Sequence, residues 1–302
     1  MNADLKVPVV HVIIPVHNRR DFTAACLRSL QDQTYTNLRV IVVDDGSTDG
    51  TAEMIAREFP SVTVLKGDGS LWWAGATALG VEWVLEHCRE DDLILTLNND
   101  TSVGPGYIDT LVDAWSRAGG RAVVGSVSVD VRDGDTIVDG GPYVEWLTAK
   151  GGSYNIGRSL REVVDDGATA THPTFLPGRG TLIPVACIRD VGNFDARRLP
   201  HYAADYEFSA RAARAGYSLI MSYEAPVFSR VDATGISTTR GRLPWRAFLG
   251  MYFSRRSPAC LLYRWRFALM APPLPTRPFF LLADTVRVVG GGLRDQLRMA
   301  KR

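Results

Sequence analysis

The sequence lacks the features that mark several large classes of protein. It has only four cysteines in 302 residues, at Cys26, Cys88, Cys187 and Cys260, and none has the short spacing of a metal site. No apolar run reaches the roughly eighteen residues that a membrane span requires. The opening residues lack the basic and apolar segments of a signal peptide. We therefore expect reduced thiols and a cytoplasmic location.

The sequence also lacks both common glycine-rich phosphate loops. Its first β-branched run, at residues 9–16, leads into P-V-H-N-R-R, where a dinucleotide-binding unit would carry G-x-G-x-x-G. The pattern G-x-x-x-x-G-K followed by Ser or Thr is absent as well. A bound nucleotide would therefore be held by other groups, such as carboxylates at the base and ribose and a metal ion at the diphosphate.

A strong overall charge is also missing, although the two ends of the chain differ. The net charge of +1 predicts neither a nucleic acid nor an acidic partner. Residues 1–236 hold 21 Lys and Arg against 31 Asp and Glu, whereas residues 237–302 hold 13 Lys and Arg against two Asp. We therefore expect one large domain at 1–236 and a basic extension at 237–302 with a different kind of surface.

What the chain does have is a regular alternation of strand and helix patterns. Apolar runs at 9–16, 38–43, 62–65 and 93–97 predict buried strands with helices between them. A βαβ series with short links folds into a parallel sheet. We therefore expect an α/β fold with a mostly parallel central sheet flanked by helices, followed by a helical C-terminal extension.

Polar side chains follow the strand at 93–97. Asn98, Asn99 and Asp100 stand where that strand would emerge from the sheet, and ligands of open α/β sheets bind at the carboxyl ends of strands. A carboxylate beside amide oxygens suits a hard divalent cation that carries phosphates. The alternative is a turn whose side chains cap the helix that begins near Pro105.

Four motifs in a fixed order carry a resemblance to a known family. They are P-V-H-N, V-V-D-D-G-S-T-D-G-T, N-N-D-T and A-D-Y-E-F-S-A-R-A, within residues 8–230. A chain with these motifs resembles the family 2 glycosyltransferases, which have the nucleotide-sugar-binding GT-A fold. Two further stretches, G-D-G-S-L-W-W-A-G and H-Y-A-A-D-Y-E-F, resemble a bacterial branch associated with cell-surface polysaccharide, often with rhamnosyl transfer.

The resemblance implies a donor site at the ends of the first four strands. Asp44 would accept hydrogen bonds from the base, Asp45 would lie near the ribose, and Trp73 could stack on a sugar or pack in the core. The residues implied to contact the nucleotide sugar are Pro15, Val16, Asn18, Asp44, Asp45, Gly67, Asp68, Trp73, Asn98 and Asn99.

The resemblance also implies a metal ligand and a catalytic base. Asp100 stands at the last position of the family's D-x-D motif and would bind Mg²⁺ or Mn²⁺, weakly before the donor arrives because two amides replace acids. Asp205 matches the catalytic acid of an E-D motif in which Ala204 replaces Glu. It would take the proton of the acceptor hydroxyl in a single inverting displacement. Capping the helix expected at 206–215 is an alternative role that need not exclude catalysis.

Other positions have two open interpretations each. Gly178, Arg179 and Gly180 stand where the family places its acceptor-side loop, and Arg179 could contact a diphosphate or belong to a plain turn. The stretch in which relatives carry a metal-binding His has none here, and Arg230 could meet a phosphate or face solvent. We expect structural roles for the histidines at 17 and 201.

Aromatic and basic residues interleave in the extension. This pattern suits an anionic membrane surface, and nothing else in the chain supports its other use, single-stranded nucleic acid. A lipid-linked acceptor would explain membrane contact, whereas the alternative is helices packed on the main domain with solvated arginines. The residues are Trp245, Arg246, Phe248, Tyr252, Phe253, Arg255, Arg256, Leu261, Arg264, Trp265, Arg266 and Phe267.

The resemblance, together with the patterns of the extension, implies an inverting, metal-dependent glycosyltransferase at the cytoplasmic membrane face. It would move a sugar from a nucleotide-sugar donor to a hydroxyl of a cell-surface glycan or lipid-linked acceptor. Two alternatives remain open. A metal motif with only one acidic residue would fit a catalytically weak, glycan-binding scaffold subunit. The fold would also fit a sugar nucleotidyltransferase, although that class needs a glycine-rich and basic loop after its first strand.

Overall fold

The computed structural model describes residues 7–230 and 244–299, and its first four strands confirm the predicted series. Each strand boundary lies within one residue of the expected one. The strands are β1 (Val10–Val16), β2 (Leu38–Asp44), β3 (Thr63–Lys66) and β4 (Leu93–Thr96), and the helices between them are α1 (Arg20–Gln31), α2 (Thr51–Glu58) and α3 (Trp72–His87).

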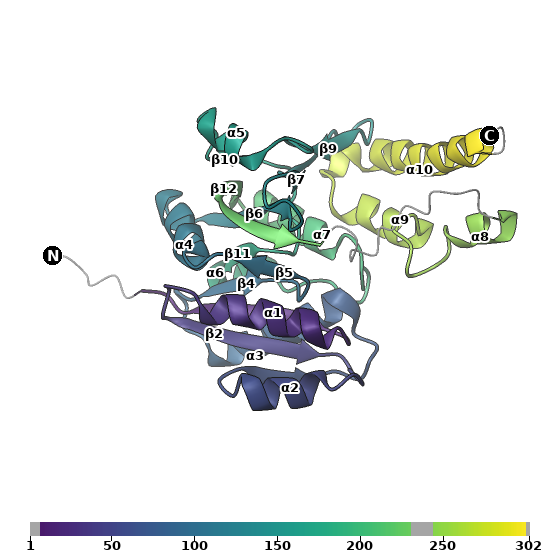
Figure 1. Cartoon of the computed structure of the whole chain (residues 1–302). Coiled ribbons are helices and arrows are strands. Elements are labelled where there is room, and N and C mark those ends of the chain that lie inside the picture. Colours follow the sequence, from purple (N-terminus) through teal and green to yellow (C-terminus); the bar gives the residue numbers. More distant parts are fainter. Residues whose placement is uncertain (1–6, 231–243, 300–302) are drawn as a thin grey trace.

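The central sheet has the strand order β10-β12-β6-β11-β4-β1-β2-β3 (Figure 1). β1 pairs in parallel with both β2 and β4, so the chain reverses its direction of travel across the sheet after β3. The loops that follow β1 and β4 therefore run to opposite sides. Such a position is a topological switch point, where open α/β sheets bind ligands. The remaining strands are β5 (Thr101–Val103), β6 (Ala122–Asp130), β7 (Ile137–Asp139), β10 (Ala170–Thr171), β11 (Thr181–Pro184) and β12 (Ser218–Ser229).

The sheet is mostly parallel, as expected. β6 and β12 pair in parallel, and β11 runs antiparallel between β4 and β6. The short strand β5 pairs with the end of β12, and β7 pairs with the end of β6, both antiparallel.

Helices cover both faces of the sheet because successive strand side chains point to opposite faces. Ile14 packs in one buried cluster with Leu27 of α1 and Ile55 of α2. Its neighbour Ile13 packs in the other, with Val81 of α3. Helix α4 (Tyr107–Arg117) joins the first cluster, while α6 (Val185–Val191) and α7 (Ala204–Arg214) join the second.

The expected capping role of Asp205 is wrong, and helix α1 begins in the same way as α7. Asp21 lies in the first turn of α1, and the cap position is taken by Arg19 with φ 64°. Helix α7 likewise has Ala203 at its cap with φ 65°, so Asp205 lies inside the first turn and does not cap it. In both helices a left-handed residue turns the chain, and no side chain accepts a hydrogen bond there.

The glycine-rich region after β6 forms short antiparallel strand pairs. The hairpin of β8 (Pro142–Val144) and β9 (Gly151–Ser153) stands beyond the edge of the main sheet (Figure 1). A short helix, α5 (Leu160–Asp165), follows it. The β8–β9 hairpin forms part of the cavity described below.

The C-terminal extension packs on the main domain through α9. It consists of α8 (Trp245–Gly250), α9 (Leu261–Met270), a 3₁₀ turn (Leu274–Thr276) and α10 (Arg277–Met299). Tyr263 of α9 joins a buried cluster with Ala74 and Ala204. Within the described ranges, no helix is both long enough and apolar enough to cross a membrane.

Candidate active site

Asp45 ties together the loops that follow the first three strands. Its backbone N–H donates to the Val16 carbonyl at 2.8 Å, and its own carbonyl accepts from Nδ1 of His17 at 2.6 Å. Its carboxylate accepts the backbone N–H groups of Gly69 at 2.7 Å and Trp72 at 3.1 Å. Because both carboxylate oxygens hold backbone, Asp45 fixes the shape of this edge. His17 has the structural role expected of it.

Asp44 keeps one carboxylate oxygen available at the same edge. The residue is 6% exposed, and its Oδ1 accepts the Ser47 N–H at 3.0 Å. No described residue donates to its Oδ2. Asn18 joins the neighbouring loop by accepting the Thr48 N–H at 2.9 Å and donating its own N–H to Ser47 at 2.7 Å. The β1 and β2 loops are therefore held together around Asp44.

Gly67 and Asp68 leave β3 toward this edge. A Cβ on Gly67 would lie 2.6 Å from the Asp45 carboxylate, so the position has no room for a side chain. Asp68 is exposed and folds back on Ser70, accepting its N–H at 2.8 Å and its hydroxyl at 2.7 Å. These hydrogen bonds lower the pKa of Asp68. Pro15, half-buried, pairs in register with Val43 near the end of β1.

The three polar residues after β4 point to three different partners. Asn98 Oδ1 accepts the indole N–H of Trp73 at 2.9 Å, and Asn99 Nδ2 donates to Thr23 Oγ1 at 3.0 Å. Asp100 Oδ2 accepts Nη1 of Arg19 at 2.9 Å. None of them caps α4, because β5 intervenes and Gly106 takes the cap position without a side-chain hydrogen bond. The capping alternative for this motif is therefore wrong.

Asp100 is the residue expected to bind a divalent cation. Residues 7–230 and 244–299 contain no group of three or more His, Cys, Asp or Glu side chains that could hold a metal ion. One carboxylate fits Mg²⁺ or Mn²⁺ when diphosphate oxygens and water complete the shell. Arg230 packs its guanidinium 5.0 Å from the Phe22 ring centre. The residues that follow it, where the resemblance implied a histidine ligand in other members, lie outside the described ranges.

Asp205 lies in the wall of a cavity of about 570 Å³. The Gly178 N–H donates to its Oδ2 at 2.8 Å, and the Tyr206 N–H lies 2.9 Å from Oδ1. Burial raises the pKa of Asp205 above the ordinary value of an aspartate, against the lowering effect of these two hydrogen bonds. A carboxylate with a raised pKa accepts a proton more readily, which suits a general base.

A short chain of contacts links this carboxylate to the end of β4. Trp73 donates to Asn98 at one end of its ring, and a Cβ on Gly178 would lie 2.0 Å from the same ring. Gly178 in turn holds Asp205. The expected donor-side and base residues therefore meet at one place, with Trp73 between them.

Arg179 and Gly180 have different surroundings although they are neighbours. Arg179 lines the cavity and donates to Asp139 Oδ2 at 3.2 Å. Gly180 has φ 76° and is enclosed by Tyr107 and Ser126, so it holds the loop in place behind the cavity. The sequence analysis did not identify Asp139 as a site residue. The only signal in its segment is the pair of glycines that follows it, which indicates a turn.

Two buried polar atoms in the cavity wall have no partner among the described residues. They are Nε of Arg179 and Nδ1 of His201. Buried polar groups are nearly always hydrogen-bonded, so each of these atoms needs an ordered water or another polar group beside it. The His201 ring packs against Trp72 and Tyr202, and burial lowers its pKa, which favours the neutral ring.

The C-terminal extension contributes a full side of the cavity. Sequence patterns missed this because the contacts join residues far apart in the chain. Phe175 stacks on Tyr206 at 4.8 Å and meets Phe267 of α9 edge-on at 5.7 Å. The lining residues from α9 and α10 are Tyr263, Arg264, Phe267, Phe280 and Asp284, and those from the hairpin are Pro142, Tyr143, Val144, Gly151 and Gly152.

Comparisons of the sequence place the chain among glycosyltransferases. The model of glycosyl transferase family 2 matches residues 11–169, and that of glycosyl transferase family group 2 matches residues 93–276. The N-acetylglucosaminyl-diphospho-decaprenol L-rhamnosyltransferase of Mycobacterium tuberculosis is 28% identical over 233 residues, 69% of this chain and 72% of that protein. Glycosyltransferase AglE of Haloferax volcanii is 26% identical over 224 residues, covering 72% and 66% respectively.

Solved structures share the fold at low sequence identity. The mannosyltransferase PcManGT from Pyrobaculum calidifontis, in complex with GDP-Man and Mn²⁺, matches with a TM-score of 0.60 at 19% identity, covering 98% of this chain and 74% of that one. S. aureus TarS 1-349 in complex with UDP matches with a TM-score of 0.55 at 14% identity, covering 93% and 72%. The expected GT-A fold is confirmed. The chain belongs to glycosyl transferase family 2 and is a glycosyltransferase that uses a nucleotide-sugar donor.

Proposed function

We propose that this enzyme inverts the anomeric carbon of its donor, with Asp205 as general base and the neighbouring cavity as acceptor site. The observation that carries the proposal is the place of Asp205 in the wall of a cavity that also holds two unpartnered buried polar atoms. The contacts through Gly178 and Trp73 to Asn98 put this cavity next to the strand-end edge. An acceptor and a donor bound at these two places would meet at Asp205.

The donor would bind at the ends of β1 to β4. The free Oδ2 of Asp44 would accept from the base, and the bare backbone at Gly67 permits close approach of the nucleotide. Asp100 would hold Mg²⁺ or Mn²⁺ together with the donor diphosphate, and the ion would supply positive charge to the departing diphosphate. Arg19 holds the Asp100 carboxylate until then.

The chemical step follows from the position of the base. The Asp205 carboxylate would take the proton of the acceptor hydroxyl as that oxygen forms a bond to the anomeric carbon. The bond from the anomeric carbon to the diphosphate oxygen breaks on the opposite face, and the electron pair leaves with the nucleoside diphosphate. One displacement of this kind inverts the anomeric configuration. Gly178 keeps the carboxylate oriented throughout.

The cavity lining supports an acceptor with both a sugar and a phosphate. The ring of Tyr143, which is 42% exposed, offers a flat face to a pyranose, and the guanidinium of Arg179 in the same lining would attract a phosphate. The Mycobacterium tuberculosis relative is named for an N-acetylglucosaminyl-diphospho-decaprenol acceptor and L-rhamnosyl transfer. We infer a lipid-linked acceptor of this kind, used in cell-surface glycan assembly, with rhamnose as the sugar to test first.

A peripheral membrane position would bring such an acceptor to the cavity. Helices α9 and α10 each keep an apolar stripe exposed at the three- and four-residue spacing of one helix face. The stripe residues are Leu262, Trp265 and Leu269 on α9 and Phe279, Leu282, Val286, Val289, Leu293 and Leu297 on α10. We propose that the basic extension at 237–302 rests on the cytoplasmic membrane face while 1–236 carries the donor site.

The test is transfer by the purified enzyme with a panel of sugar nucleotides and a polyprenyl-diphosphate-linked N-acetylglucosamine, with Mn²⁺ or with EDTA. We expect product from one donor only, with the anomeric configuration inverted. Transfer should be lost in Asp205→Asn and kept in the exposed control Asp165→Asn. Donor hydrolysis or retention of configuration would contradict the proposal. A chain that binds glycan but transfers nothing would favour a scaffold role, and pyrophosphate release from a sugar phosphate would favour a nucleotidyltransferase.

A further inference from the structure

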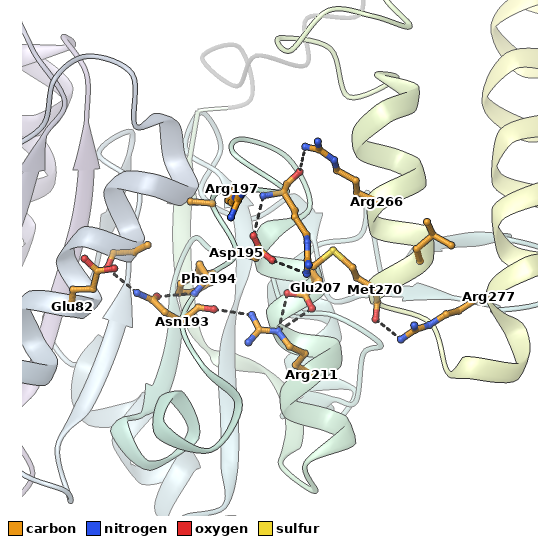
Figure 2. Close-up of a pocket in the computed structure, with 14 residues that line it drawn as sticks. Glu82, Asn193, Phe194, Asp195, Arg197, Glu207, Arg211, Arg266, Met270 and Arg277 are labelled. Carbon is orange, nitrogen blue, oxygen red and sulfur yellow. Dashed lines mark hydrogen bonds and ion pairs between the residues drawn. The ribbon is translucent and has the colours of Figure 1, made fainter.

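A second and larger hollow, here named the arginine hollow, lies against other residues of α9. It has a volume of about 880 Å³ and is lined by α3, the segment 193–198, α7, α9 and the first residue of α10 (Figure 2). Neither the donor edge nor Asp205 contributes to it. Its charged residues are Arg197, Arg198, Arg211, Arg266 and Arg277 with Glu82, Asp195 and Glu207.

Two of the three acids are already neutralised. Both oxygens of Glu207 accept Nε of Arg211 at 2.9 Å, and Asp195 pairs with Arg198 at 3.4 Å. The other three arginines, Arg197, Arg266 and Arg277, form no ion pair with a carboxylate in the described part of the chain. Glu82 alone opposes them. The arginine hollow therefore carries an excess of positive charge.

Backbone carbonyls hold two of these guanidinium groups in place. Arg266 Nη1 donates to the Arg198 carbonyl at 3.0 Å, and Arg277 Nη2 donates to the Met270 carbonyl at 3.1 Å (Figure 2). Arg277 Nε also donates to the Pro272 carbonyl at 3.1 Å. A guanidinium has five N–H groups, so each keeps donors for a ligand. Fixed guanidinium forks match the oxygen atoms of a phosphate.

The arginine hollow opens beside the apolar stripe of α9. Leu269 lines the hollow and is 52% exposed, and it is the last residue of the stripe that begins at Leu262. Arg266 follows Trp265 of the same stripe directly. A surface that is apolar on one side and cationic on the adjoining side is complementary to an anionic phospholipid layer, with acyl chains beside charged headgroups.

We propose that the arginine hollow binds the phosphate of an anionic phospholipid headgroup when α9 rests on the membrane. The proposal rests on the membrane position proposed above and adds a defined site to it. Arg197 comes from the catalytic domain, so a headgroup held between Arg197, Arg266 and Arg277 would fix the orientation of that domain on the membrane. The cavity at Asp205 would then face the lipid-linked acceptor in one orientation.

The experiment is sedimentation of the full chain with vesicles of phosphatidylcholine, with and without phosphatidylglycerol. Arg197→Gln tests the hollow, because Arg197 is exposed and no described residue pairs with it. Arg287→Gln is the matched control, since it removes one exposed charge from α10 outside the hollow. We expect Arg197→Gln to weaken binding to the anionic vesicles about tenfold, the loss expected of one charge-assisted hydrogen bond, and to leave binding to neutral vesicles unchanged.

Charge and geometry are separated by Arg197→Lys, which keeps the charge and loses the fork. If the hollow is a headgroup site, Arg197→Lys should bind anionic vesicles more weakly than the wild type. If the attraction is diffuse, Arg197→Lys should bind them as tightly as the wild type. Equal losses in Arg197→Gln and Arg287→Gln would overturn the site and leave the membrane position intact. Absence of wild-type binding to any vesicle would overturn both. Stabilisation of the chain by inorganic phosphate, with no preference for anionic vesicles, would assign the hollow to a free anion instead.

Discussion

Gly178 donates its backbone N–H to Asp205 at 2.8 Å from a position where no side chain fits, because a Cβ would lie 2.0 Å from the Trp73 ring. The orientation of the proposed base is therefore set by the close packing of a loop against an indole. This indole also holds Asn98 on the donor side. One packing contact thus couples the base to the expected donor site.

A methyl group at this position tests that coupling. Gly178→Ala should push the loop from Trp73 and lower kcat at least tenfold, and overpacking should destabilise the fold by about 1–3 kcal/mol. Turnover and thermal unfolding measured on the same preparations separate the two effects. Gly104→Ala is the control, because a Cβ there meets nothing within 4 Å. Unchanged turnover in Gly178→Ala would show that this contact does not position the base.

The pH dependence of turnover tests the role of Asp205. A general base works when deprotonated, so the rate should fall as the pH drops through its pKa. Burial raises that pKa, so the fall should begin at a higher pH than the ordinary aspartate value of about 3.9 would give. Asp205→Asn should lower kcat by about 10²- to 10⁴-fold and leave nucleotide binding unchanged. The acidic limb of kcat/KM is the measurement, and its persistence in Asp205→Asn would assign it to another group.

The pair of Arg19 and Asp100 makes a prediction about metal affinity. The 2.9 Å ion pair competes with a cation for the same carboxylate, so Arg19→Gln should bind Mn²⁺ more tightly than the wild type in the absence of donor. Asp100→Ala should lose the metal-dependent part of nucleotide binding. Calorimetric titration of Mn²⁺, and then of nucleoside diphosphates with and without Mn²⁺, measures both. Equal nucleotide affinity with Mn²⁺ and with EDTA in all three proteins would rule out a metal at Asp100.

Phe267 tests whether the C-terminal extension belongs to the acceptor site. Its ring meets Phe175 edge-on at 5.7 Å inside the cavity wall, whereas the donor edge lies on the first four strands. Phe267→Ala should therefore raise the acceptor KM several-fold and leave the donor KM unchanged. Phe253→Ala is the control, because that ring is 78% exposed and does not line the cavity. A rise in both KM values would indicate a general loss of structure.

The sequence predicted the sheet and the polar residues at its strand ends because both depend on local patterns. Runs such as V-V-H-V-I-I identify a buried strand within a few residues, and the polar groups that follow must emerge at its end. The helix starts could not be predicted because they depend on the backbone angle φ. Arg19 and Ala203 have left-handed φ values, which neither residue type indicates. The cavity depends on contacts such as Asp139 with Arg179 that join distant segments, and no periodicity encodes these.

The fold should lose stability in acid through a buried pair at the start of β1 and β4. Asp92 accepts Nε2 of His11 at 3.2 Å and the N–H groups of Val9 at 3.1 Å and Arg89 at 2.9 Å. Burial lowers the pKa of His11, so the native ring stays neutral where an unfolded histidine, with a pKa of about 6.5, takes a proton. Stability from His11 is therefore complete above about pH 6.5 and declines as the pH falls below it.

The same carboxylate adds a second, more acidic loss. Burial alone would raise the pKa of Asp92, but its hydrogen bonds outweigh burial and lower it. Its contribution is therefore complete above the unfolded value of about 3.9 and disappears as the pH falls through the native value. Asp92→Asn should cost about 3 kcal/mol at pH 7, because buried N–H donors lose an acceptor, and should remove the loss of stability that begins below about pH 3.9. Urea unfolding across this pH range is the measurement. His11→Gln should flatten the slope below pH 6.5 alone, and an unchanged slope in that variant would assign the loss to other groups.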